Sequence, residues 1–155
     1  MLGAVTAFMK ITEALLAEHV VFHNLFDYVE RAVPRAKSLA EVRVLSSLLE
    51  TMLRTHSQVE DHLLIAPLEA AISQMGQAEN FHDEHDEIEE DLARVRSLKQ
   101  VPEARRCLLK AVVLSRKHFD KEERIVFPMA EKQLSAKSLL TLGRRWEEQR
   151  TVPIV

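Results

Sequence analysis

The sequence predicts an all-α protein, an antiparallel up-and-down four-helix bundle with a short extra C-terminal helix. Its composition favours helix, because the chain is 46% hydrophobic yet has only three Gly and 5% aromatic residues. Apolar residues recur at spacings of three and four, which is typical of amphipathic helices. Few breaks interrupt this pattern, so long helices follow one another through short links. The 155 residues suit a single domain spanning 1–155.

Residues that start or stop helices divide the chain into five segments. Pro34 ends the first, and Ser38 with Glu41 forms a capping box that begins the second. Gly76 marks the break before the third, and Pro102 is well placed as a first helical residue of the fourth. We therefore expect helices over 4–33, 38–73, 80–98 and 102–133, and a short last helix over 137–149.

The charge balance and the single cysteine limit the partners and the compartment. With 21 basic and 24 acidic residues the chain has no basic excess, so we expect no nucleic-acid partner. No apolar run reaches the roughly 18 residues of a membrane-spanning helix, and the start lacks the layout of a signal peptide. Cys107 can form no internal disulfide, which favours a reducing, cytoplasmic location. Whether the last helix mediates a homodimer stays open.

The chain contains an internal repeat. AEHVVFHNLFDYV (17–29) resembles DEHDEIEEDLARV (83–95), with Glu-His followed by apolar residues at matching places. RTHSQVEDHLLIAPLE (54–69) resembles RKHFDKEERIVFPMAE (116–131). The bundle is therefore interpreted as two helical hairpins, each with one Glu-His helix and one His-x-x-x-Glu helix.

Two His–Glu pairs lie next to apolar residues in the sequence, so their polar side chains are expected to face the core. His56 and Glu60, like His118 and Glu122, are four residues apart, so each pair shares one helix face. A buried carboxylate without a partner is costly. A metal ion neutralises it and takes a neutral imidazole as a further ligand. One isolated pair would more often be solvated on a charged face, but the repetition favours a metal site.

Counting from the hairpin turns brings four histidines to one level of the bundle. At about 1.5 Å per residue, His19 and His56 lie at similar heights from the first turn, as do His85 and His118 from the second. Together with the two carboxylates they form an N/O ligand set that suits Fe, Mn or Zn. Because each carboxylate can bridge, we expect two metal ions.

The segment HFDKEERIVFP (118–128) fits the H-x-x-x-E-E-x-x-x-F-P helix of the hemerythrin-like, or HHE cation-binding, domains, and EHDE (84–87) fits their third-helix histidine. The chain resembles this family over roughly residues 10–132. The resemblance implies a four-helix bundle that holds two non-haem iron ions, with terminal imidazoles and two bridging carboxylates. Carried over by position, the implied ligands are His19, His56, Glu60, His85, His118 and Glu122.

The first repeat departs from the family pattern at its carboxylate. Pro67 follows Glu60 by seven residues, whereas Pro128 follows Glu122 by six. If Pro67 sets the register, Asp61 takes the ligand position instead. We favour Glu60, because its spacing of one helical turn from the preceding histidine needs no distortion.

Two further residues are candidate ligands. His23, four residues after His19, would be the fifth histidine that hemerythrins carry, or else a polar residue on the flank of its helix. Glu89, four residues after His85, is its counterpart in the repeat, or else a solvated glutamate. Five histidines would leave one open position, which suits reversible binding, whereas four would leave more and favour redox turnover.

The remaining polar residues have simpler expected roles. Glu123 and Asp61, if they are not ligands, would accept a hydrogen bond from the second ring nitrogen of a ligand histidine. His62 and His82 are expected at the surface. Cys107 is expected to be a small core residue.

Three functions follow from these residues. The leading hypothesis is a di-iron protein that binds O₂ or a related small ligand, NO or peroxide, for sensing, storage or handling. The second is an enzyme with the same site that reduces peroxide or NO, or donates iron in repair. The third, from another class, is a helical interaction module with a structural metal.

Overall fold

The computed structural model describes residues 9–75 and 78–150, and all their side chains except those of 78–82. Within these ranges the chain forms helices and turns but no strand, which confirms the all-helical prediction. The α-helices are α1 (Ile11–Ala32), α2 (Leu39–Glu60), α3 (Ala66–Gln74), α4 (Ala78–Arg94), α5 (Val101–Lys121), α6 (Phe127–Gln133) and α7 (Ala136–Arg150). A 3₁₀ turn, η1 (Val33–Arg35), follows α1, and two π-helical turns, η2 (Asp61–Ile65) and η3 (Glu122–Val126), join α2 to α3 and α5 to α6.

The helix boundaries differ from the predicted segments at two ends. Helix α1 begins at Ile11, with Lys10 in an extended conformation before it, and residues 4–8 lie outside the described residues. Helix α4 ends at Arg94 rather than at residue 98. The reason is local, because the amides of Arg96 and Ser97 bond to carbonyls three residues back, which tightens and ends the last turn.

The predicted start signals of α2 and α5 are confirmed. The hydroxyl oxygen of Ser38 accepts a hydrogen bond of 3.3 Å from the Glu41 amide, and the Glu41 carboxylate accepts one of 3.0 Å from the Lys37 amide. Pro102 lies in the first turn of α5, where its missing N–H leaves no bond unmade. Helix α2 therefore begins where side chains accept hydrogen bonds from free amides, and α5 begins where proline removes one such amide.

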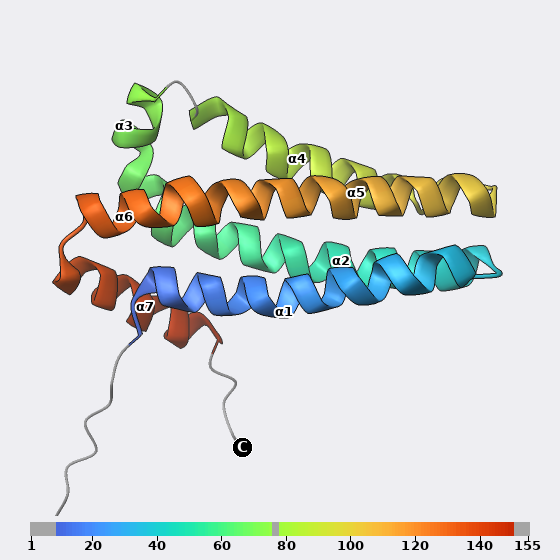
Figure 1. The fold of residues 1–155 in the computed structure, drawn as a ribbon, viewed down its shortest axis with the longest axis horizontal. Coiled ribbons are helices and arrows are strands. Elements are labelled where there is room, and N and C mark those ends of the chain that lie inside the picture. Colours follow the sequence, from blue (N-terminus) through green and yellow to red (C-terminus); the bar gives the residue numbers. More distant parts are fainter. Residues whose placement is uncertain (1–8, 76–77, 151–155) are drawn as a thin grey trace, which may run out of the picture.

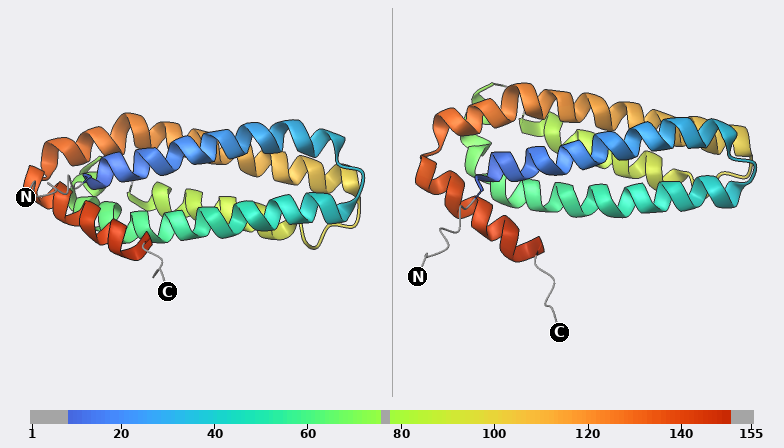
Figure 2. Two further views of the ribbon diagram at one scale, coloured as in Figure 1. Left: turned by 90° about the horizontal axis from the view of Figure 1, so that it is seen from below. Right: turned by 60° about the horizontal axis from the view of Figure 1, so that its bottom comes forward.

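Four long helical segments lie side by side (Figure 1). In this view α1 runs from left to right and α2 returns, and α4 and α5 repeat this course after α3. Helix α4 packs on α2 and α5, and α5 also packs on α2 and α1. The last helix, α7, packs against the N-terminal part of α1 (Figure 2).

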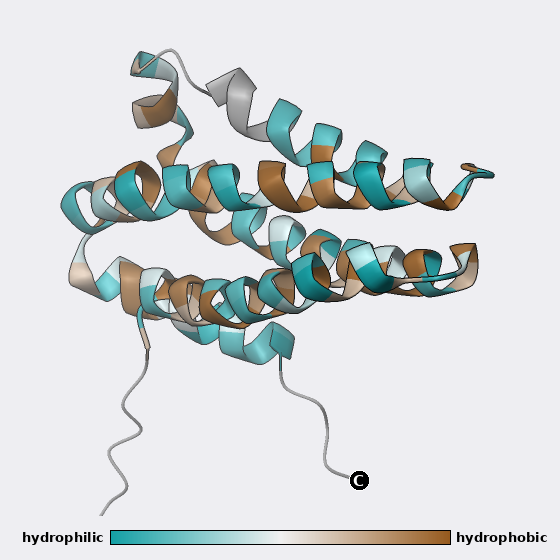
Figure 3. Cartoon of the chain, turned by 45° about the vertical axis from the view of Figure 1, so that its right-hand side comes forward, coloured by the Kyte–Doolittle hydropathy of each residue, from teal (hydrophilic) through white to brown (hydrophobic). Residues whose placement is uncertain are grey.

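Two hydrophobic clusters form the core. The larger one, around Phe26, Leu49 and Leu108, fills the half of the bundle near η1. The smaller one, around Leu15 and Leu63, fills the half near α7. Hydrophilic and hydrophobic residues alternate along the long helices, as the colouring in Figure 3 shows for the residues visible there. A layer of buried polar side chains separates the two clusters, and this layer is the site described next.

Each π turn lies just before a proline, Pro67 or Pro128. In both turns an amide bonds to the carbonyl five residues back, Ala66 to Asp61 and Phe127 to Glu122. A proline inside an α-helix has no N–H to donate, and its ring clashes with the carbonyl four residues back. The extra residue of a π turn moves that carbonyl, so the helix continues past the proline.

Candidate metal centre

The buried polar layer crosses the bundle between the two hydrophobic clusters, and the four long helices contribute its side chains. His19, for example, follows Leu15 of the smaller cluster and precedes Phe22 of the larger one. Four imidazoles and two carboxylates are buried there, none more than 8% exposed: His19, His56, His85, His118, Glu60 and Glu122. The structure therefore brings together all six side chains that the family resemblance implies as ligands.

The six side chains form two overlapping groups of four. In each group, one ligand atom from every member lies within 4.8 Å of the others. One group contains His19 and His56, and the other contains His85 and His118. Glu60 and Glu122 belong to both groups, so each carboxylate reaches the two pairs of imidazoles at once.

The Nε2 atoms of the four histidines point into the centre of the layer. They lie 3.2 Å apart between His19 and His56, and 2.7 Å apart between His85 and His118. Glu122 reaches both pairs, since its Oε2 is 3.4 Å from His19 and its Oε1 is 2.5 Å from His118. Glu60 Oε2 lies 3.9 Å from His56 and 3.7 Å from His85. The geometry is that of two nitrogen pairs facing two shared carboxylates.

The Nδ1 atom of every one of these histidines faces a carboxylate outside the centre. The distances are 2.9 Å from His19 to Glu123, 2.6 Å from His56 to Glu18, and 2.7 Å from His118 to Glu84. The fourth, from His85 to Asp61, is 3.5 Å. A carboxylate acceptor keeps the proton on Nδ1 and leaves the Nε2 lone pair free to bind a metal.

These four outer contacts repeat with the internal symmetry of the chain. Glu18 and Glu84 each precede a buried histidine and hold the histidine of the other helix in the same hairpin. Glu123 and Asp61 each follow a shared carboxylate and face a histidine of the opposite hairpin. The roles expected for Glu123 and Asp61 match these positions. Sequence reasoning missed Glu18 and Glu84, although the repeated Glu-His dipeptide marks them both.

The shared carboxylates perturb one another and the imidazoles beside them. Burial and the charge of Glu122 raise the pKa of Glu60 well above its usual range. Burial also raises the pKa of Glu122, but the charge of His118 outweighs it and brings that pKa to about 2. For His118, burial lowers the pKa, while Glu122 and Glu84 raise it to about 9. Burial lowers the pKa of His19 to about 4. Protons therefore occupy part of this layer when no cation does.

The arrangement fits a metal cation better than it fits protons alone. None of the four oxygens of Glu60 and Glu122 accepts a hydrogen bond of normal geometry within the described ranges. Buried acceptors without donors are costly. A cation among these atoms satisfies the oxygens and the nitrogens together, and the mixture of imidazole and carboxylate suits iron, manganese or zinc.

The packing around His19 keeps the layer dry. The ring of Phe119 stacks on the imidazole of His19 with centroids 3.8 Å apart and an interplanar angle of 3°. Phe22 approaches the ring of His56 at 5.3 Å, and Phe127 approaches that of His19 at 5.2 Å. These apolar walls lower the local dielectric, which strengthens every charge interaction inside.

Glu60, rather than Asp61, occupies the centre of the layer. Glu60 is fully buried and belongs to both groups, whereas the side chain of Asp61 is 34% exposed and lies beyond His85. The helix is nevertheless distorted just after Glu60, because η2 accommodates Pro67. Between His56 and Glu60 the helix is undistorted, as expected, since α2 stays α-helical through Glu60.

The structure does not bring His23 or Glu89 into either group of the described residues. The Nε2 atom of His23 lies 3.2 Å from Glu123, and its Nδ1 lies 3.3 Å from Arg116. Glu89 accepts a hydrogen bond of 3.1 Å from Arg54. His23 is one helical turn beyond His19. It therefore lies on the flank of α1, outside the centre of the layer.

The other polar residues named from the sequence fall outside the layer. His62 is exposed, as expected. The side chain of His82 lies outside the described residues. Cys107 is half-buried against the larger cluster, and its thiol donates to the carbonyl of Asp91 at 3.2 Å. Burial and the charge of Asp91 raise the pKa of this thiol, so it is a packing residue.

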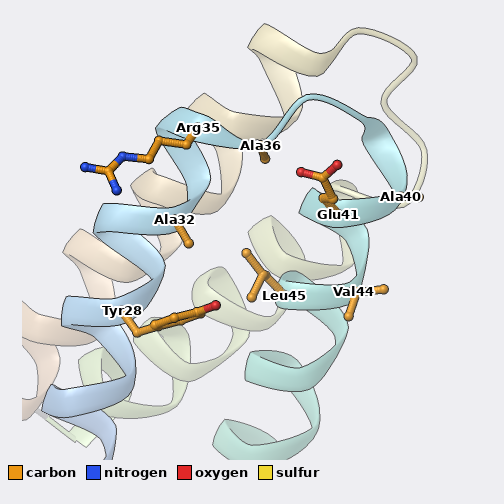
Figure 4. Close-up of a pocket in the computed structure, with 8 residues that line it drawn as sticks. All are labelled: Tyr28, Ala32, Arg35, Ala36, Ala40, Glu41, Val44 and Leu45. Atoms are coloured by element: carbon orange, nitrogen blue, oxygen red, sulfur yellow. The ribbon is translucent and has the colours of Figure 1, made fainter.

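Two hollows differ in their relation to the layer. A small one of about 10 Å³ borders His56, His85 and His118 and is otherwise lined mostly by apolar side chains such as Leu53 and Ile88. A far larger one of about 560 Å³ lies at the opposite end of α1 and α2 (Figure 4). Its lining contains no histidine: Tyr28, Ala32, Arg35, Ala36, Ala40, Glu41, Val44 and Leu45. Of these two hollows, only the small one adjoins the candidate ligands. A third hollow, of about 290 Å³, borders His56 together with Glu18 and Arg150.

One of three comparisons with known proteins gives a match. The family model of the hemerythrin HHE cation binding domain matches residues 10–130. A search of curated proteins found no match, and neither did a search of solved structures. None of the helices in the described part of the chain is long and apolar enough to cross a membrane.

Proposed function

The chain belongs to the hemerythrin HHE cation-binding family, and we propose that it is a non-haem di-iron protein that binds O₂ or a related small ligand, NO or peroxide. In this proposal the long helices form an antiparallel up-and-down four-helix bundle around the ions. The ligands are His19, His56, Glu60, His85, His118 and Glu122. We further propose a cytoplasmic location, which the lone Cys107 supports.

The observation that carries the proposal is the sharing of Glu60 and Glu122 by both imidazole pairs. A single ion would need only one pair, and the other two histidines would then be buried with their Nε2 atoms facing each other. Two ions, one at each pair, would be held by all six side chains, with Glu60 and Glu122 within reach of both. Nitrogen and oxygen donors in this ratio support iron, with manganese or zinc as alternatives.

The small hollow beside three of the imidazoles supports a small ligand. Its volume of about 10 Å³ is close to the minimum that holds one water molecule. Leu53, Ile88 and Phe119 form its apolar walls beside Ser57 and Glu89, and its small volume excludes a larger substrate. Two iron ions supply reversible redox chemistry when bound. The residues of the chain hold the ions, exclude water and fix the imidazole tautomers.

Redox turnover of peroxide or NO, driven by an external reductant, is the second candidate. The observation that favours it is the position of His23, which contacts Glu123 and Arg116 instead of the centre. Four imidazoles leave more positions open to ligands than five would. A saturated ion beside a single open position, which suits reversible O₂ binding, therefore has less support.

The test is metal analysis combined with optical spectra. The purified protein should contain about two irons per chain, as two four-ligand positions require. Its spectrum is recorded after anaerobic reduction, after exposure to air and after vacuum. A colour that bleaches under vacuum supports reversible binding, and an irreversible change supports turnover. A protein that contains zinc alone, and takes up no iron after anaerobic preparation of the apoprotein, contradicts the proposal.

A further inference from the structure

The last helix, α7, touches the metal centre indirectly through one carboxylate. Glu18 Oε2 lies 2.6 Å from Nδ1 of His56. Its other oxygen, Oε1, accepts hydrogen bonds from the indole N–H of Trp146 at 3.0 Å and from Nε of Arg150 at 2.7 Å. Both donors belong to α7, so this helix holds the acceptor that orients His56.

Within the described residues, the equivalent carboxylate of the other hairpin has no contact with α7. Glu84 lies 2.7 Å from Nδ1 of His118 and accepts a hydrogen bond of 2.9 Å from Lys121. Lys121 is on α5, one turn beyond His118 itself. The bundle alone therefore holds the second acceptor, whereas the first depends on a helix added after the bundle.

The position of α7 depends on close contact with the start of α1. Gly143 is buried, and a Cβ atom there would lie 1.8 Å from the carbonyl oxygen of Met9. Leu139, on the same face, is buried in the smaller cluster, and Trp146 packs against that cluster. Figure 2 shows α7 beside the first turns of α1. Because Glu18 lies on α1 and its donors on α7, this contact sets the distance between them.

We propose that α7 sets the metal affinity of the position formed by His19 and His56, by holding Glu18 as the acceptor for His56, and that the two metal positions are unequal for this reason. The inference rests on the proposed two-ion centre. Glu18, Trp146 and Arg150 are positioning residues, since none of them belongs to a ligand group. Loss of such an acceptor typically weakens metal binding about 10–100-fold. Release of α7 should loosen one ion and leave the other.

The test measures metal release from the full chain loaded anaerobically with ferrous iron. A colorimetric ferrous chelator is added, and the two ions leave in two phases. Trp146→Phe combined with Arg150→Met removes both donors to Glu18 while keeping an apolar ring and chain in place. One release phase should accelerate about 10–100-fold, and the other should stay as in the parent. Trp146→Phe combined with Arg150→Lys keeps a donor at position 150 and should retain much of the slow phase.

Three further variants make the comparison specific. Arg145→Met changes an exposed residue of α7 and should match the parent. Gly143→Ala, which displaces the whole helix, should accelerate the same phase as the double variant. Glu84→Gln should accelerate the other phase. Circular dichroism of each metal-free chain checks that the bundle is folded.

A second measurement does not need the metal. In the metal-free protein, NMR reports how fast the Nδ1 protons of His56 and His118 exchange with solvent. The double variant should expose the proton of His56 and leave that of His118 protected. Equal protection in parent and variant, or equal acceleration of both iron phases, would overturn the role of α7. A parent that binds no iron, or only one ion per chain, would instead overturn the two-ion centre on which the inference rests.

Discussion

Replacement of Glu122 by Ala tests whether the carboxylates are shared. Glu122 is one of four candidate ligands in each of the two groups, so its loss removes a ligand from both metal positions. If a four-ligand site contributes about 10–16 kcal/mol in equal parts, one ligand contributes about 3 kcal/mol, or roughly a hundredfold in affinity. His118 belongs to one group only, so His118→Ala should weaken one position by a similar factor and spare the other.

The assay is metal content after equilibration with a small excess of ferrous iron and gel filtration. We expect about two ions per chain in the parent, about one in His118→Ala, and close to none in Glu122→Ala. Glu123→Ala is the comparison variant, because this neighbouring glutamate is partly exposed and contacts Nδ1 of His19 and Nε2 of His23 rather than a metal position. It should weaken only the position that contains His19, and at saturating iron the chain should still hold two ions.

The folding of the metal-free variants is measured separately, by chemical unfolding. Glu122 is fully buried beside His118, and its removal leaves that imidazole without its charge partner, so the apoprotein should lose stability. Iron content is therefore compared only between variants that remain folded. Equal iron content in Glu122→Ala and Glu123→Ala would refute the reasoning. So would a Glu122→Ala protein that keeps one ion tightly while His118→Ala loses both, since the carboxylate would then not be shared.

The remaining predictions concern the same layer. Glu60→Ala should lose both ions and Asp61→Ala should keep them, as judged by metal content; the reverse would place Asp61 at the bridge. Iron binding should weaken as pH falls from about 9, because Glu122 and Glu84 raise the pKa of His118 to about 9 and the cation must then displace the proton on this imidazole; a pH-independent affinity between about 6 and 9 would contradict this. His23→Ala should keep the iron content and air-oxidation rate of the parent, and a faster oxidation would make His23 a ligand. Phe119→Ala should lower the free energy of unfolding by about 3–5 kcal/mol, measured in denaturant, and an unchanged stability would show that its stacking on His19 is not needed.

Much of the fold and most of the site follow from periodic patterns in the chain. Helical spacing of apolar residues predicts the helices, because one face of each must be buried. The spacing of His56 and Glu60 predicts a shared face, and its repetition at His118 and Glu122 predicts convergence at one level. Each of these predictions uses the spacing of residues within a single helix, and the internal repeat supplies the same spacing a second time.

Features that depend on the rotation of one helix against another cannot be predicted from spacing within single helices. Whether Glu60 or Asp61 faces the centre depends on where η2 takes up its extra residue, and two registers of the same sequence are compatible with Pro67. His23 lies one turn from His19, but only the packing of α1 against α5 places it beside Arg116 and Glu123.

The partners of the outer nitrogens were decided by tertiary contacts alone. The dipeptide Glu18-His19 marks a pair of neighbours, yet Glu18 holds the histidine of α2, and His19 is held by Glu123 from the opposite hairpin. Nothing in the helical pattern of 137–149 indicates that α7 reaches Glu18 through Trp146 and Arg150. The periodicity of a helix predicts which residues share a face, whereas only the packing of the helices determines which side chains that face contacts.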